Sequence, residues 1–430
     1  MHEASPVPGE PRRVVVTGLG CITPCGADVA STWASMVAGR SGIDRITRFD
    51  ASTYSSRIAG EIRGFDAEAL LGRRAVRRLG LFMQYALVAA DEAMADAGFD
   101  VAARIAGRSA EPWPDPDRIG VYIGSGIGGF PEIVDQAAGL QDRGIRDVSP
   151  LFIPRSLINL AAGQVAIRYD ARGPSLCLAT ACAVGNHAIG EAWRAIRGGD
   201  ADVIIAGGTE ASLTPLGYGG FMNMRALSRR NDEPQRASRP FDRDRDGFVM
   251  SEGAGVVVLE ALPHARARAA RVYCELRGYA ATTDAHHITA PAPGGRGAAR
   301  CIELALRRAG LAPSEVGYVN AHGTSTPAND VAETQALHKA LGDAAGALMV
   351  SSTKGVTGHL LGAAGGIEAV ATCKALYHGV IPPTANCEHP GEGCDLDYVA
   401  GDARQVGIQA AISNGFGFGG TNAVLAFARL

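Results

Sequence analysis

The chain has 430 residues, of which 47% are hydrophobic and 20% are charged, and its formal net charge is −3. This composition is typical of a globular protein with a buried core, and the length corresponds to roughly two to three domain-sized units. The charge balance gives no reason to expect nucleic acid or an anionic membrane as a partner.

The N-terminal residues 1–11 contain no apolar run of the kind found in signal peptides, and we expect them to be disordered or extended. No later run has the apolar length of a membrane span, so we expect a cytoplasmic protein. The nine cysteines are odd in number and scattered, which argues against a disulfide framework or a structural zinc site. We expect no bound metal and mostly reduced, buried cysteines.

Short apolar runs rich in β-branched residues alternate with Ala-rich helical segments along the chain, and the runs of the first half are expected to be strands buried on both faces. The predicted strands are 13–18, 119–124, 201–208, 253–260, 272–279, 316–320 and 348–352, and the predicted helices include 81–97 and 185–197. This alternation predicts an α/β fold with two comparable α/β halves.

Two polar segments interrupt this pattern. The Pro- and Asp-rich segment 110–117 is predicted to be a surface loop or insertion, because proline ends helices and cannot join a central strand. The segment 229–247 alternates positive and negative side chains and is predicted to be a solvated, ion-paired loop.

Two cysteines lie in the segment GPSLCLATACAVGNHA, residues 173–188. Cys177 is expected inside a strand. Cys182 is expected after that strand and near the N-terminus of a helix, where unpaired backbone N–H groups and the helix dipole favour a thiolate. Position alone leaves a functional thiol and a packed core cysteine as equal alternatives.

Two histidines occupy similar surroundings. His322 lies in YVNAHGTSTP and His359 in SSTKGVTGHLLG, each expected after a strand and among glycines and small hydroxyl residues. A lone histidine is usually structural, but turns of this kind are where active-site loops are built.

These segments together resemble β-ketoacyl-[acyl-carrier-protein] synthases, the elongating condensing enzymes of type II fatty-acid synthesis. The resemblance is carried by ATACAVG, NAHGTSTP, SSTKGVTGHLLGAAGG and the closing NGFGFGGTNA, and it runs in order from about residue 12 to the last residue. It implies the thiolase fold, with two pseudo-equivalent halves in five αβαβα layers. The N-terminal half, 12–265, would carry the nucleophile, and the C-terminal half, 266–430, both histidines.

The resemblance also implies the chemistry, a decarboxylating Claisen condensation. Cys182 would accept an acyl group from a carrier-protein thioester, while His322 and His359 would act on the malonyl thioester and stabilise the enolate left when carbon dioxide departs. The backbone N–H groups of Cys182 and Phe418 would form the oxyanion hole. No cofactor on the enzyme is implied, since the substrates arrive on the phosphopantetheine arm of the acyl carrier protein.

Further positions are matched by the same resemblance. Lys354 and Glu368 match a pair that organises the histidine region, for which an ordinary buried ion pair is the alternative. Phe418 matches a gating position, and Thr324 and Thr326 are assigned to substrate binding or gating. The positions matching the carrier-protein surface are Arg74, Arg77, Arg78, Arg146 and Arg225.

Taken alone, a basic run such as that at residues 72–78 is more often a solvated face. At Asp147, related enzymes commonly have a basic residue instead. The family also implies a dimer, either of identical chains or with a homologous chain-length subunit.

Competing readings account for less of the sequence. The glycine patterns at 124–129 and 415–420 satisfy GxGxxG. The first lacks the acidic residue at a strand end that a nicotinamide-binding site requires, and the second cannot open a βαβ unit. A cysteine hydrolase would use Cys182 and His322 but would leave His359 without a role, and there is no GxSxG for a serine hydrolase.

Related condensing enzymes fit less well. A thiolase would need a second cysteine near the C-terminal end, and an initiating synthase would carry Asn in place of one histidine. A chain-length subunit would lack Cys182. Fatty-acid elongation and a type II polyketide or polyene pathway share this chemistry, and the sequence leans towards elongation.

Overall fold

The computed structural model describes residues 11–108 and 113–430. The predicted disordered or extended N-terminus therefore lies outside the described residues apart from Pro11, as does part of the predicted loop 110–117. Within the described ranges, no helix combines the length and the apolar character that crossing a membrane requires.

The first half of the chain forms five strands in the order β5-β4-β6-β7-β1. β4 runs parallel to β5 and β6, whereas β7 is antiparallel to both β6 and β1. The strands are β1 (Val14–Ile22), β4 (Ile119–Gly124), β5 (Ser175–Leu176), β6 (Val203–Glu210) and β7 (Gly253–Ala261). All but β5 are buried along their whole length, as the apolar runs predict.

The second half repeats this arrangement in the order β10-β9-β13-β14-β8, with the same parallel and antiparallel pairs. Its strands are β8 (Cys274–Thr283), β9 (Val316–Asn320), β10 (Met349–Ser351), β13 (Ala410–Gly417) and β14 (Thr421–Ala428). The halves meet where Val15 and Val16 of β1 pair with Glu275 and Cys274 of β8. The two pseudo-equivalent halves are thus visible in the strand order itself.

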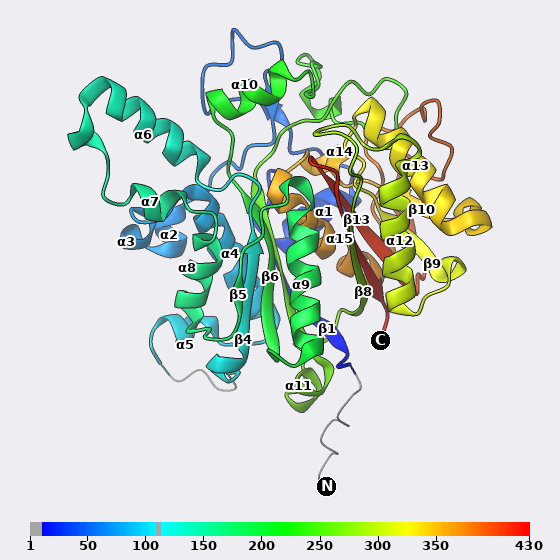
Figure 1. Cartoon of the computed structure of the whole chain (residues 1–430), viewed down its shortest axis with the longest axis horizontal. Helices are drawn as coiled ribbons and strands as arrows, with labels where there is room; N and C mark the ends of the chain where they lie inside the picture. Colours follow the sequence, from blue (N-terminus) through cyan, green and yellow to red (C-terminus); the bar gives the residue numbers. More distant parts are fainter. Residues whose placement is uncertain (1–10, 109–112) are drawn as a thin grey trace.

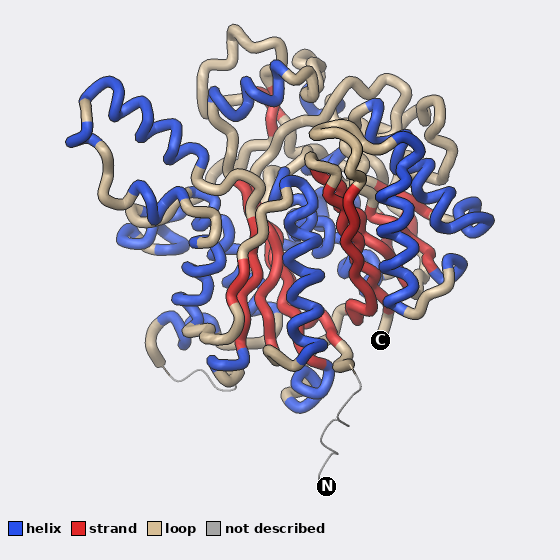
Figure 2. Tube along the Cα trace, viewed as in Figure 1, coloured by secondary structure: helices blue, strands red, loops and turns tan. Residues whose placement is uncertain are grey.

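Helices fill three layers around the strands, as Figures 1 and 2 show. The central layer, between the two halves of the sheet, is made by α9 (Val184–Gly198) and α15 (Ala364–His378). α4 (Leu81–Asp96) and α8 (Leu160–Tyr169) cover the outer face of the first half, and α12 (Arg296–Ala309) and α13 (Pro327–Leu341) that of the second. Because α15 is apolar around its circumference and buried from Ala364 to Cys373, it suits the central layer.

Glycines allow the two central helices to approach closely. A Cβ atom at Gly185 of α9 would lie 2.5 Å from the backbone nitrogen of Gly366 in α15. Only a residue without a side chain fits at this distance. The crossing brings the N-terminal turns of both helices to the same end of the molecule.

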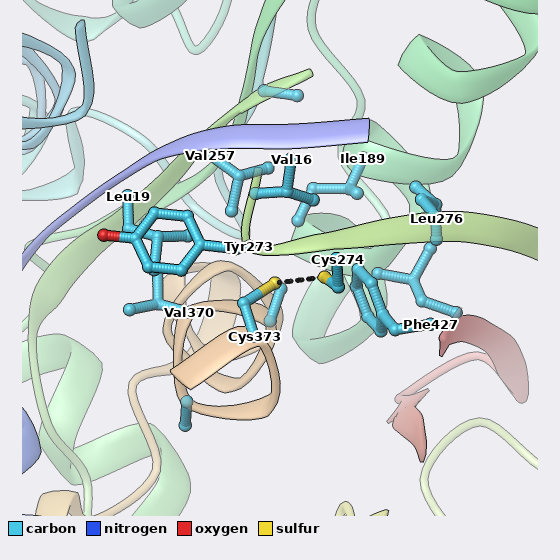
Figure 3. Close-up of a cluster of buried hydrophobic side chains, with 14 of the residues drawn as sticks. Val16, Leu19, Ile189, Val257, Tyr273, Cys274, Leu276, Val370, Cys373 and Phe427 are labelled. Carbon is cyan, nitrogen blue, oxygen red and sulfur yellow. Dashed lines mark hydrogen bonds between the residues drawn. The ribbon is translucent and has the colours of Figure 1, made fainter. Parts of the chain in front are cut away.

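The core between the halves is built from aliphatic, aromatic and cysteine side chains. Figure 3 shows Val16 and Val257 of the first half near Leu276 and Phe427 of the second, with Val370 of α15 among them. The thiols of Cys274 and Cys373 lie 3.4 Å apart in this core. Six of the nine cysteines are buried and Cys25, Cys177 and Cys182 are half-buried.

The other elements are short or peripheral. The helices are α1 (Val29–Val37), α2 (Ala67–Leu71), α3 (Arg73–Val76), α5 (Val101–Ile105), α6 (Phe130–Arg143), α7 (Phe152–Ser156), α10 (Pro215–Asn223), α11 (Leu262–Ala267) and α14 (Lys354–Thr357). β2 (Asp44–Arg45) pairs with β3 (Ile58–Ala59), and β11 (Val380–Ile381) with β12 (Arg404–Gln405). The boundary predicted at residue 265 falls inside α11 and stays a prediction.

Three local predictions were wrong. Cys177 lies beyond β5, which ends at Leu176 because it pairs with β4 over only two residues. His359 does not directly follow a strand, since α14 separates it from β10. The segment 229–247 is not uniformly solvated: Arg239 and Asp242 form a buried ion pair, because the Asp242 carboxylate also accepts backbone N–H groups from a neighbouring loop.

Candidate active site

One cavity of about 360 Å³ brings together Cys182, His322 and His359, three residues that are far apart in the sequence. Its walls are largely apolar and aromatic, and at its mouth lies the exposed side chain of Arg225. The other residues used below that line it are Phe221, Phe248, Thr324, Thr326, Phe416, Gly417 and Phe418. An enclosed apolar pocket with a few converging polar groups is the usual form of a small-molecule site.

Cys182 lies in a tight turn that leads directly into α9. Ala181 has a φ of 48°, and residues Ala181–Ala183 form a 3-10 turn before the helix begins at Val184. A positive φ is uncommon for a residue with a Cβ atom, and such strained positions cluster at functional sites. The turn places the Cys182 thiol at the cavity wall.

The electrostatic surroundings of the thiol act in opposite directions. Burial raises the pKa of Cys182 to about 11, while the charge of Lys354 and the backbone N–H of Phe418 act to lower it. Because burial dominates, the resting group at neutral pH is the thiol. The helix position alone had suggested a thiolate.

The end of β13 lies directly against the Cys182 turn. A Cβ atom at Gly417 would lie 3.0 Å from the carbonyl oxygen of Thr180 and 3.2 Å from the backbone nitrogen of Ala183. This close approach brings the backbone N–H of Phe418 to the Cys182 sulfur, where the N–H of Cys182 itself also contributes. Two backbone donors thus converge on the Cys182 sulfur.

His322 is held by its backbone and leaves its ring unbonded. The backbone N–H groups of His322 and Gly323 donate to the Glu333 carboxylate at 2.8 and 2.7 Å, and Asn414 Nδ2 donates to the same group at 3.0 Å. Glu333 lies on α13 and is 1% exposed. This buried carboxylate fixes the loop after β9, a role that the sequence analysis missed because α13 meets this loop only in the folded chain.

His359 is fixed in the same manner by a different element. Its backbone N–H donates to the Val249 carbonyl at 2.8 Å, and its carbonyl accepts from Ser251 at 2.9 Å. The His322 and His359 rings lie 5.4 Å apart between centroids and are nearly perpendicular. In the part of the chain that is described, neither ring makes a hydrogen bond to the protein, so both stay available to a substrate.

Both imidazoles are neutral at physiological pH. Burial, helped by the charge of Lys354, lowers the pKa of His322 and of His359 well below the ordinary value of histidine. A neutral imidazole carries one ring N–H that can donate to an oxygen. The pair can therefore supply two uncharged donors to one developing oxyanion.

Lys354 and Glu368 form a buried ion pair beneath the histidines. Lys354 begins α14, its side chain is 1% exposed, and its Nζ donates to the Glu368 carboxylate. Burial raises the pKa of Glu368 to about 7, against the lowering effect of Lys354. Neither residue lines the cavity, so the pair acts on the site through its field and by holding the elements in place.

Glu210 is a second buried carboxylate that the sequence analysis missed. It ends β6, is fully buried, and accepts the backbone N–H of Gly126 at 2.9 Å and of Gly362 at 3.1 Å. The Ser125 and Ser212 hydroxyls donate to it as well. Burial raises its pKa. A charged residue ending an apolar strand was the signal that could have revealed it.

The predicted positions are brought together to different degrees. Phe418, Thr324 and Thr326, which the resemblance assigns to gating or substrate binding, line the cavity. The two threonine hydroxyls lie 2.9 Å apart. Of the five arginines assigned to the carrier protein, only Arg225 lines the cavity. Arg74, Arg77, Arg78 and Arg146 are exposed and lie outside it.

Comparison with known proteins identifies the class. A family model described as the N-terminal domain of β-ketoacyl synthases matches residues 11–265, and one for the C-terminal domain matches residues 273–388. The chain belongs to the β-ketoacyl synthase family. It is therefore a condensing enzyme of the acyltransferase type.

Individual relatives agree with this assignment. The 3-oxoacyl-[acyl-carrier-protein] synthase 2 of Synechocystis sp. is 52% identical over 418 residues, covering 97% of this chain and 98% of that protein.

Two solved structures have the same fold. The complex of a type II polyketide synthase acyl-carrier protein with its ketosynthase, bound to the hexaketide, has a TM-score of 0.88 at 34% identity, covering 98% of this chain and 100% of that one. The ishigamide ketosynthase/chain length factor has a TM-score of 0.89 at 33% identity, with the same coverage. The predicted thiolase fold is confirmed.

Proposed function

We propose that this protein elongates acyl chains on an acyl carrier protein, condensing a Cys182-bound acyl group with malonyl-carrier protein to give a β-ketoacyl-carrier protein and carbon dioxide. The observation that carries the proposal is the convergence of one thiol and two neutral imidazoles on a single apolar cavity. Such a cavity suits an acyl chain, and its polar groups sit where the thioester must react.

The first half-reaction is acyl transfer to Cys182. Its sulfur attacks the thioester carbonyl carbon, the bond to the phosphopantetheine sulfur breaks, and the released thiol takes the proton that Cys182 loses. The backbone N–H groups of Cys182 and Phe418 hold the negative oxygen of the tetrahedral intermediate. The product is an acyl-cysteine that serves as the electrophile of the next step.

The second half-reaction takes place at the histidines. The bond between the malonyl α-carbon and its carboxylate breaks, carbon dioxide leaves, and the electron pair forms an enolate whose oxygen accepts the N–H groups of His322 and His359. The enolate carbon attacks the acyl-cysteine carbonyl. The Cys182 thiolate then leaves and takes a proton from solvent water. Lys354 and Glu368 position the histidine loops, and the charge of Lys354 helps burial to keep the imidazoles neutral.

The substrates are delivered on the phosphopantetheine arm of the carrier protein, and no cofactor on the enzyme takes part in these steps. Arg225 supports this delivery, because it is exposed and also lines the cavity, and a guanidinium can bind the phosphate of the arm. The exposed arginines Arg74, Arg77, Arg78 and Arg146 extend the proposed docking surface for an acidic partner.

We also propose a dimer in the cytoplasm, formed by two copies of this chain or with a homologous chain-length subunit. The edge strand β5 supports the dimer, because Ser175 and Leu176 are exposed and their strand has a free edge at the end of the sheet.

Nine free cysteines are in keeping with a reducing compartment. The division into halves at residues 12–265 and 266–430 is part of the same proposal.

The test is intact-protein mass spectrometry of the purified protein mixed with acyl-carrier-protein thioesters of different chain length and unsaturation. We expect an acyl adduct on the wild type and none on Cys182→Ala. No adduct from any donor would contradict the proposed function.

A type II polyketide or polyene pathway is the second candidate, favoured by the two structural neighbours from such systems. The higher identity to the Synechocystis enzyme favours elongation of fatty acids. The same mass measurement separates the two, since preference for saturated donors supports elongation and preference for polyene donors supports the second candidate.

A further inference from the structure

A second cavity, of about 440 Å³, lies far from the active site. Cys182 lies just before α9 and Arg197 lies near its last residue, which separates the two sites by about 22 Å along a 15-residue helix. Figure 1 shows this end of the molecule with the start of β1 and the C-terminus. The cavity is lined by Arg13, Arg197, Glu275, Arg277, Arg308, Ala309 and Arg429.

The charge inside this cavity is strongly unbalanced. Glu275 is the one carboxylate among its lining residues, and Arg13 engages it through two hydrogen bonds of 2.8 and 2.6 Å. Within residues 11–108 and 113–430, the other four arginines make no ion pair with a carboxylate. Leu430, which follows Arg429, does not line the cavity. Five arginines and one carboxylate therefore line this concave space, and four of the arginines have no ion-pair partner of their own among the described residues.

Uncharged groups hold several of these guanidiniums in place. Arg308 donates to the Tyr279 carbonyl at 2.9 Å. Arg429 donates twice to the Leu376 carbonyl, at 3.0 and 2.9 Å. Arg197 stacks on the Trp193 ring at 4.5 Å. These contacts fix the side chains without neutralising them, which lowers the entropic cost of binding an anion.

Helix dipoles account for part of this arrangement only. Arg197 and Arg308 lie at the C-terminal ends of α9 and α12, where positive side chains are favoured. Arg429 follows β14 but donates to the carbonyl of Leu376 in the last turn of α15, whereas Arg277 lies within the strand β8. Helix ends thus account for three of the four arginines, and Arg277 joins them from a strand.

We propose that this cavity binds a small molecule carrying two adjacent phosphate groups. The guanidinium group presents paired N–H donors that match phosphate oxygens. One phosphate brings about 1.5 to 2 negative charges, so two phosphates match the four arginines that have no ion-pair partner of their own among the described residues. A concave site of this size admits a diphosphate but not a folded protein surface. This inference does not rest on the proposed condensing activity.

Isothermal titration calorimetry of the full chain with inorganic pyrophosphate tests the proposal. At about 0.15 M salt we expect pyrophosphate to bind at least about tenfold more tightly than inorganic phosphate, because the second phosphate gains further charge-assisted hydrogen bonds. Arg277→Ala and Arg308→Ala should each weaken pyrophosphate binding by about tenfold or more. Adenosine diphosphate is a third titrant: tighter binding than pyrophosphate identifies a nucleotide as the source, and equal binding identifies free pyrophosphate.

Arg307→Ala is the matched control, because Arg307 is exposed on the same helix next to Arg308 and does not line the cavity. We expect it to bind pyrophosphate as the wild type does, and thermal melts of all three variants check that they fold. Three results would overturn the proposal: absence of pyrophosphate binding to the wild type, equal affinity for phosphate and pyrophosphate, or an equal loss in Arg307→Ala.

Discussion

The turn before α9 and the turn before α15 occupy equivalent places in the two halves of the protein. Ala181 has a φ of 48° and Leu361 a φ of 50°, each opens a three-residue 3-10 turn, and each turn leads into a 15-residue helix. The middle residue of the first turn is Cys182, and that of the second is Gly362. The same backbone therefore serves two purposes.

The neighbouring strand decides which purpose each turn serves. β6 ends in Glu210, whose carboxylate accepts the N–H of Gly362 at 3.1 Å. β13, its equivalent, ends in Gly417, which leaves the N–H groups of Cys182 and Phe418 without a protein carboxylate. One turn donates to a carboxylate of the protein, and under the proposed function the other donates to the oxyanion that forms during the reaction. The duplicated fold thus contains a filled and an open version of one anion site.

Removal of the Cys182 thiol should have the largest effect, because this thiol belongs to the turn before α9 and has no counterpart in the turn before α15. In Cys182→Ala we expect acyl transfer to fall by about 10⁴-fold or more, since Cys182 is the one thiol among the described residues that line the cavity. Release of carbon dioxide from malonyl-carrier protein should persist, because the histidines and backbone donors are retained. Intact mass and carbon dioxide release measure the two steps, and loss of both in a folded variant would contradict separate roles.

The histidines should show the reverse pattern. His322→Ala or His359→Ala is expected to lower decarboxylation by about 10² to 10³-fold, the effect of removing one donor from an oxyanion site. The acyl adduct on Cys182 should still form, because neither imidazole is assigned to acyl transfer. Mass spectrometry after single turnover measures the adduct, and normal elongation by both variants would show the assignment to be wrong.

The role of the Glu210 carboxylate at the turn before α15 can be tested through the free energy of unfolding. Glu210→Gln replaces an acceptor of several buried donors by an amide whose NH₂ must face one of them. We expect a loss of about 1.5 to 3 kcal/mol in the free energy of unfolding, measured in urea. Glu303→Gln, an exposed change on α12, is the control and should have little effect. A loss below about 0.5 kcal/mol in Glu210→Gln would refute the role.

A smaller effect distinguishes the two half-reactions by pH. The pKa of Cys182 is raised to about 11, so its thiolate fraction rises as pH increases towards that value. The rate of acyl transfer should increase by about tenfold per pH unit between pH 7 and 9. Decarboxylation should stay flat, because His322 and His359, with lowered pKa values, remain neutral throughout. Stopped-flow acylation and carbon dioxide release measure the two profiles, and parallel profiles would contradict this difference.

Most of the fold was predictable because its strands are continuous apolar runs. β4 and β9 have the predicted bounds, α4 ends one residue earlier than predicted, and α9 is one residue longer at each end. The predictions that failed concern segments whose surroundings come from elsewhere in the chain. Arg239 and Asp242 look solvated in sequence and are buried because a distant loop supplies partners for the carboxylate.

The chemical groups of the candidate site could be predicted from the sequence, since Cys182, His322 and His359 each stand in a short motif of small residues that a tight turn requires. Tertiary structure alone decided their surroundings: the neutral state of the imidazoles, the raised pKa of the thiol and the contrast between Glu210 and Gly417. These properties depend on burial and on charges brought near by the fold, such as Lys354 beside residues from both halves. A linear pattern fixes which groups are present, whereas desolvation and proximity exist only once the two halves have packed together.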